Sequence, residues 1–133
     1  MVAICVLQSC SPRTHDKSEI EAAMREYDRL LMKMDADSIA LLYDINGDLG
    51  NAAHGRDSIR NFLHSFSNIQ MLSQSSTSDV IEMMSDSAIQ KGSYNQVDVV
   101  GNDTIRVRGT YIANWKWNDV EGWKIKKMET TPL

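Results

Sequence analysis

The sequence has no cysteine after residue 10 and no long apolar run in that part of the chain. Residues 18–133 can therefore fold without a disulfide in either redox compartment, and they contain no stretch able to cross a bilayer. Excess basic charge is missing too. The net charge is −4 and the pI is near 5.3, so nucleic-acid phosphates would be repelled on average. The 133 residues are enough for one domain with a sizeable core.

Sequence signatures of metal, nucleotide and covalent chemistry are also missing. No His, Cys or carboxylate residues have a recognised metal-ligand spacing, and no nucleophile elbow, phosphate loop or dinucleotide fingerprint occurs. We therefore expect no metal and no cofactor. The last hairpin combines basic and aromatic residues, but Arg106, Arg108 and Lys116 alternate onto the face opposite the tryptophans. A single-strand-binding groove needs both kinds of residue on one face, so we expect no nucleic-acid partner.

The first ten residues, "MVAICVLQSC", differ from the rest. Met1 to Leu7 are apolar, as in the hydrophobic region of a secretion signal, and a small residue precedes Cys10. This ending resembles the lipobox of bacterial lipoproteins, in which the cysteine is lipidated. The resemblance implies a signal remnant over residues 1–10, a lipid on Cys10 as the one membrane contact, and a tether over residues 11–17. The protein would then lie at the periplasmic face of the bacterial envelope. If Cys10 is incidental, we expect a cytoplasmic protein.

The spacing of apolar residues predicts helices first and strands afterwards. Ser18 and Glu21 form an expected capping box, and apolar residues recur at helical spacing behind it as far as Met34. A shorter helix covers "SIALLYDI", a short strand follows it, and a third helix begins after Gly55. The Ser- and Gln-rich stretch before residue 79 has no clear pattern. Four strands are predicted over residues 79–84, 88–99, 104–117 and 123–131. This order indicates an α+β fold with helices covering one face of an antiparallel sheet.

The stretch "GTYIANWKWNDVEGWKI" holds all three tryptophans of the chain. A five-residue turn pairs Trp117 with Trp123 and Trp115 with Ile125 on one face of a hairpin. We interpret these residues mainly as a hydrophobic wall that closes one end of the sheet.

Four segments together resemble the nuclear transport factor 2-like superfamily, in its SnoaL-like branch of small stand-alone bacterial proteins. They are "DADSIALLYDINGDL", "GRDSIRNFL", "SDSAIQKGSY" and "RGTYIANWKWNDVEGWKI". The resemblance covers residues 18–133 as a single domain. It implies a cone, in which a strongly curved antiparallel sheet wraps around about three N-terminal helices and leaves a pocket at the wide end. It also implies a homodimer formed through the sheet.

The leading functional hypothesis is a non-catalytic domain that binds a small hydrophobic ligand or serves as an assembly module. Met128 can line the pocket only if a bulge near Lys126 and Lys127 shifts the alternation of the last strand, since two lysines on the core side would be costly. The expected pocket residues are Tyr27, Tyr43, Asn51, Tyr94, Tyr111, Trp115 and Met128.

The alternative hypothesis is a small isomerase, dehydratase or hydrolase that uses Tyr27 with Asp48 or His54. The resemblance to ketosteroid isomerases puts Tyr27 where a phenol could donate a hydrogen bond to an oxyanion. The position of the general base falls at or near Asn51, and an amide cannot accept a proton at physiological pH. Asp48 or His54 would have to act as the base instead.

Overall fold

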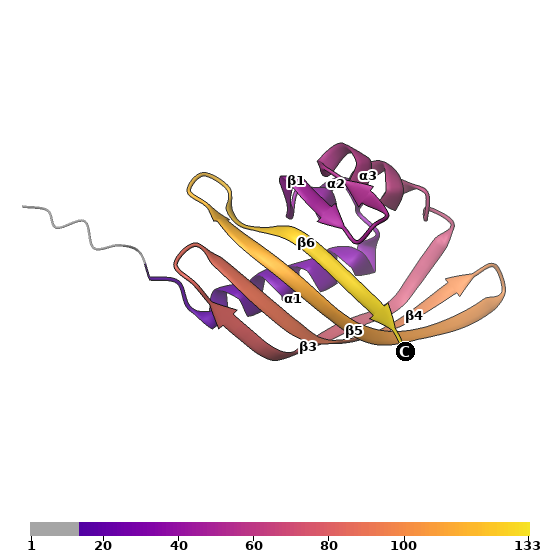
Figure 1. The fold of residues 1–133 in the computed structure, drawn as a ribbon. Helices are drawn as coiled ribbons and strands as arrows, with labels where there is room; N and C mark the ends of the chain where they lie inside the picture. The colour runs from indigo at the N-terminus through magenta and orange to yellow at the C-terminus, as the bar shows by residue number, and fades with distance from the viewer. Residues whose placement is uncertain (1–13) are drawn as a thin grey trace, which may run out of the picture.

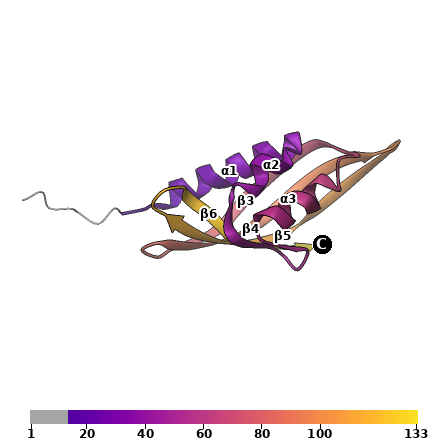
Figure 2. The ribbon, with the colours of Figure 1, turned by 90° about the horizontal axis from the view of Figure 1, so that it is seen from above.

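Helix α1 (Lys17–Lys33) crosses one face of the sheet (Figures 1 and 2). The structure is a computed structural model that describes residues 14–133, so Cys10 and the expected signal segment lie outside the described residues. The capping box expected at Ser18 and Glu21 is wrong. Asp16 is the N-cap and accepts from the backbone N–H of Ser18, while the Glu19 carboxylate accepts from the N–H of Asp16. The helix therefore begins before the predicted cap.

The second helix is shorter than the sequence indicates. Helix α2 (Ala36–Ala40) ends before Tyr43, which instead opens strand β1 (Tyr43–Leu49). The reason is tertiary, because β1 pairs in parallel with the last strand and the carbonyl of Leu42 accepts from the N–H of Ile125 at 2.8 Å. Strand β2 (Ala53–His54) and helix α3 (Arg56–His64) follow, with Gly55 as the N-cap of α3.

Six strands form one sheet in the order β2-β1-β6-β5-β4-β3. The four long strands are antiparallel neighbours, and β1 is the parallel exception. Figures 1 and 2 show this sheet curving around the helices without closing into a barrel. The prediction of an α+β fold with a curved sheet around N-terminal helices is confirmed. The long strands are β3 (Ile69–Met83), β4 (Ser87–Val100), β5 (Asp103–Asn118) and β6 (Gly122–Pro132).

Strand β3 begins at Ile69, ten residues before the predicted start at residue 79. Its Ser- and Gln-rich first half lacks the apolar alternation that marks a strand, and pairing with β4 holds it in place instead. This strand therefore supplies polar side chains to the inner face of the sheet.

The bulge predicted in the last strand is confirmed. Asn114 pairs with Lys127, whereas the next residue of β5, Trp115, pairs with Ile125, so Lys126 is the extra residue. The shift turns Met128 inward opposite the buried Ala113. The bulge thus keeps Lys126 out of the core and lets β6 bury an apolar side chain on either side of it, Ile125 before and Met128 after.

The aromatic hairpin pairs as predicted. Trp117 lies opposite Trp123, with ring centroids 5.5 Å apart in an edge-to-face arrangement. The ring of His15 packs on both, with centroids 4.2 Å from Trp117 and 5.0 Å from Trp123. The packed part of the chain therefore extends to His15, inside the expected tether.

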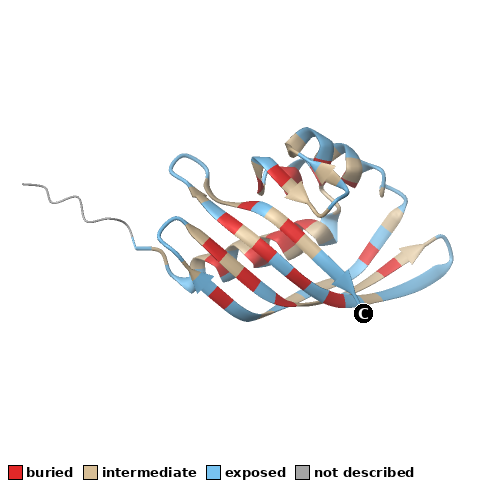
Figure 3. Ribbon diagram, viewed as in Figure 1, coloured by how far each residue is buried: buried red, intermediate tan, exposed pale blue. Residues whose placement is uncertain are grey.

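The core lies between α1 and the inner face of β4, β5 and β6, and buried residues alternate with more exposed ones along β4 and β5 (Figure 3). Each helix contributes one fully buried isoleucine to the core: Ile20 from α1, Ile39 from α2 and Ile59 from α3. Within residues 14–133, no helix has the length and apolarity that a bilayer span requires.

Candidate functional site

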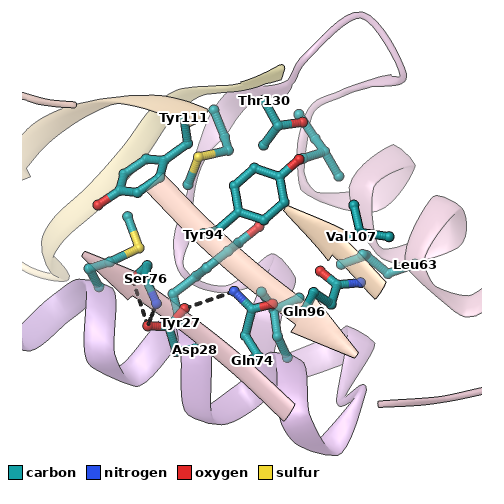
Figure 4. Close-up of a pocket in the computed structure, with 14 residues that line it drawn as sticks. Tyr27, Asp28, Leu63, Gln74, Ser76, Tyr94, Gln96, Val107, Tyr111 and Thr130 are labelled. Carbon is teal, nitrogen blue, oxygen red and sulfur yellow. Dashed lines mark hydrogen bonds between the residues drawn. The ribbon is translucent and has the colours of Figure 1, made fainter. Parts of the chain in front are cut away.

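A cavity of about 300 Å³ lies between helices α1 and α3 and the inner face of the sheet. Fourteen residues from seven elements line it, and all of them are drawn in Figure 4. Most are apolar or aromatic. The polar ones are Asp28, Gln74, Ser76, Gln96 and Thr130.

Two glycines shape the wall of this cavity. Tyr94 on β4 lies opposite Gly109 on β5, and Tyr111 on β5 lies opposite Gly92 on β4. A Cβ atom at Gly109 would be 2.7 Å from the Tyr94 hydroxyl oxygen, and one at Gly92 would be 2.9 Å from the Tyr111 hydroxyl oxygen. Each ring therefore occupies the space that a side chain on the neighbouring strand would need.

Tyr27 contributes to the wall from α1, and its hydroxyl already has a protein partner. The hydroxyl oxygens of Tyr27 and Tyr43 are 3.0 Å apart, and the two rings meet edge to face. Tyr43 is 0% exposed and lies outside the lining residues. Burial raises the pKa of both phenols, so both stay protonated through the neutral range.

Asp28 places a carboxylate in the cavity wall. Its Oδ1 accepts from Nε2 of Gln74 at 3.1 Å. Its Oδ2 accepts from the backbone N–H of Ser76 at 3.2 Å and from the Ser76 hydroxyl at 2.6 Å. Figure 4 shows these bonds joining α1 to the first half of β3. Three protein donors thus hold Asp28 in one orientation.

Two glutamines carry further polar atoms beside Asp28. The Gln74 amide nitrogen faces Asp28, and its oxygen, Oε1, is buried without a hydrogen-bond partner among the described residues. The Gln96 amide nitrogen donates to Oδ2 of Asp98 at 2.7 Å. Asp98 is 7% exposed, and its Oδ1 is also without a partner in residues 14–133. This end of the cavity is therefore rich in acceptors.

The structure brings four of the seven expected pocket residues to this cavity, and they are Tyr27, Tyr94, Tyr111 and Met128. Tyr43 lies behind Tyr27, as described above. Trp115 is 2% exposed and donates from Nε1 to Oε1 of Gln90 at 3.0 Å, outside the lining residues. Asn51 is exposed in the turn between β1 and β2.

Asp48 and His54 meet each other away from the cavity. They are paired across β1 and β2, with His54 Nδ1 2.5 Å from Asp48 Oδ1, and the side chain of His54 is 71% exposed. Neither residue lines the cavity, whereas Leu49 does. Because neighbouring strand residues point to opposite faces, the inward position of Leu49 turns Asp48 outward.

Sequence reasoning missed the polar residues of the cavity. Asp28 directly follows Tyr27 on α1, so the helical face assigned to the core could have been widened by one position. Gln74 and Ser76 have the two-residue spacing of one strand face, but their segment had no predicted structure. No three His, Cys, Asp or Glu side chains gather as a metal site anywhere in residues 14–133.

The comparisons with known proteins identify the fold. No protein-family model matches the chain, and no curated protein matches its sequence. Solved structures do match. One is a ketosteroid isomerase-like protein from Erwinia carotovora atroseptica, with a TM-score of 0.78 and 15% identity, covering 87% of this chain and 95% of that one.

Two further structures name the fold directly. A nuclear transport factor 2-like protein with a cystatin-like fold from Novosphingobium aromaticivorans has a TM-score of 0.74 and 15% identity, covering 89% of this chain and 82% of that one. A nuclear transport factor 2-like superfamily protein from Salmonella enterica has a TM-score of 0.74 and 14% identity, covering 86% of this chain and 89% of that one. The chain has the nuclear transport factor 2-like fold. At these identities the likeness assigns no site residue.

Proposed function

We propose that this domain binds a small, mainly apolar molecule in the cavity and does not convert it chemically. The observation that carries the proposal is the cavity, which has aromatic and aliphatic walls and a few polar groups at one end. Ligand sites are commonly concave and mainly apolar, with volumes from about 300 Å³ upward. A ligand for this cavity is therefore small.

The polar groups of the cavity support binding better than catalysis. The hydroxyl of Tyr27 is engaged by Tyr43, and Asp28 already accepts three hydrogen bonds. The alternative enzyme needs Tyr27 to act with Asp48 or His54, and neither of those residues lines the cavity. The short contact between Asp48 and His54 joins a candidate acid and base, but at an exposed edge where water competes.

Proposals about the family branch, the membrane anchor and the oligomeric state of the protein rest on its sequence. We propose membership of the SnoaL-like branch, a lipid on Cys10 that holds the domain at the bacterial envelope, and pairing of two copies through the outer face of the sheet. Ile112, 36% exposed on that face of β5, supports the pairing. An assembly role would use that pairing rather than the cavity.

The test is a titration with 2-phenylethanol followed by NMR chemical shifts. We expect saturable shifts in the spectrum of the protein and an unchanged spectrum of the alcohol after long incubation. Val107→Trp should abolish binding because the indole would fill space at the cavity wall. Thr110→Trp is the matched control, since Thr110 is exposed on the other face of β5. Binding that survives Val107→Trp, or turnover of the bound molecule, would contradict the proposal.

A further inference from the structure

The charge of the cavity has one sign. Asp28 is the one lining residue with a formal charge, and no Lys, Arg or His side chain is among the fourteen. No ion pair involving Asp28 or Asp98 occurs in residues 14–133. Gln74 lies beside Asp28 in the cavity wall, and Gln96, another lining residue, is bonded to Asp98, which lies outside the lining. A charge in an apolar wall without a counter-ion favours a ligand of opposite charge.

The hydrogen-bonding capacity of the cavity points the same way. Oδ2 of Asp28 accepts two hydrogen bonds, but Oδ1 accepts one, so a lone pair of Oδ1 is open. Oε1 of Gln74 lacks a donor altogether. Turning that amide over would aim its oxygen at the Asp28 carboxylate, so the orientation with Oε1 unpaired is fixed by Asp28. A ligand that donates hydrogen bonds supplies what both oxygens lack.

The rest of the wall suits the same ligand. The rings of Tyr94 and Tyr111 line the cavity on the sheet side, and aromatic faces attract cations. The negative charge of Asp28 also acts on Tyr111. Burial is the main cause that raises the pKa of the Tyr111 phenol, and the Asp28 carboxylate raises it further. An anionic ligand would meet the same carboxylate without a basic residue to offset it.

We propose that the bound molecule carries a protonated amine, held by the carboxylate of Asp28 and the amide oxygen of Gln74, with its apolar part against Tyr94 and Tyr111. The inference rests on the proposed binding function and adds the chemical class of the ligand. Ammonium has three donors and no acceptor, which matches an end of the cavity where acceptors are in excess.

The test compares three probes that share one ring and differ in their polar group: 2-phenylethylamine, 2-phenylethanol and phenylacetate, each titrated at neutral pH and followed by NMR. We expect the amine to bind about tenfold or more tightly than the alcohol, as a charge-assisted hydrogen bond in a partly dry site provides. The carboxylate should bind most weakly. Asp28→Asn should remove the preference for the amine while the alcohol still binds.

Two further variants keep the result decisive. Asp57→Asn removes one negative charge from an exposed position on α3 and should leave the preference unchanged. Thr130→Lys adds a cation at the exposed rim of the cavity and should shift the preference toward phenylacetate, even if Asp28→Asn fails to fold. Equal binding of the amine and the alcohol would overturn this inference alone. Failure of all three probes to bind would overturn the proposed function with it.

Discussion

At the residue scale, the pair formed by Tyr27 and Tyr43 shows how the first helix is tied to the parallel strand. The two hydroxyls satisfy each other at 3.0 Å in the core, and Tyr43 is inaccessible to water. Removing one hydroxyl leaves the other buried without its partner, which is more costly than removing both. The pair therefore acts as a unit.

We expect Tyr43→Phe to lower the free energy of unfolding by about 1–3 kcal/mol, the usual cost of leaving a buried polar group unsatisfied. Adding Tyr27→Phe should cost little more, because no unpaired hydroxyl then remains. Urea unfolding of the two single variants and the double variant measures the coupling. Tyr94→Phe is the control, since its hydroxyl has no hydrogen bond to any described residue. A double variant that loses the sum of the single losses would refute the coupling.

At the element scale, the curved strands β4 and β5 shape the cavity through their glycines. Gly92 and Gly109 each lie opposite a tyrosine of the neighbouring strand. A Cβ at Gly109 would also clash with the backbone carbonyl of Thr131 on β6, and one at Gly92 with the carbonyl of Thr77 on β3. Backbone atoms cannot move aside as a flexible side chain can. The two glycines thus allow both the curvature and the position of the rings.

We expect Gly109→Ala to lower the free energy of unfolding by about 1–3 kcal/mol, as overpacking of a tight site does. The displaced Tyr94 ring should also weaken binding of 2-phenylethanol. Thr110→Ala, at the next residue on the exposed face of β5, should change neither quantity appreciably. Urea unfolding and the NMR titration give both measurements. Equal effects of the two substitutions would show that the close approach at Gly109 is not a constraint.

At the scale of the whole molecule, the packing of His15 against the tryptophan hairpin fixes where the N-terminal segment meets the folded domain. Cys10 lies five residues earlier in the sequence. A lipid on Cys10 would therefore hold the hairpin end of the domain close to the membrane, because five residues extend to about 18 Å at most.

Labelling bacterial cells that express the protein with a radioactive fatty acid tests this anchor. We expect the label on the wild-type protein and on Cys5→Ala, and its loss in Cys10→Ala, since lipobox chemistry modifies only the cysteine after the small residue. Membrane fractionation of the same three proteins should follow the label. Label that persists in Cys10→Ala would rule out this site, and an unlabelled wild-type protein would rule out the anchor.

The sequence by itself determined the α+β class, the curved sheet around the helices, the tryptophan pair and the bulge at Lys126. The α+β class, the tryptophan pair and the bulge follow from local patterns: one face of a helix or strand must be apolar, and paired lysines cannot face a core. The curvature of the sheet was expected from the family that the sequence resembles. Four cavity residues, Tyr27, Tyr94, Tyr111 and Met128, were predicted for the same reason, combined with the fold that the sequence resembles.

Only the tertiary structure decided the polar part of the cavity. Asp28 and Ser76 are 48 residues apart and meet because α1 lies across β3, whose first half has no apolar pattern to reveal it. Tyr43 lies in strand β1 and not in the predicted helix because β1 pairs with β6. Asp48 points away from the cavity because Leu49, the next residue of β1, points into it. Local patterns report which face is buried. Which distant polar groups share that face depends on strand pairing and helix packing, which no short stretch of sequence encodes.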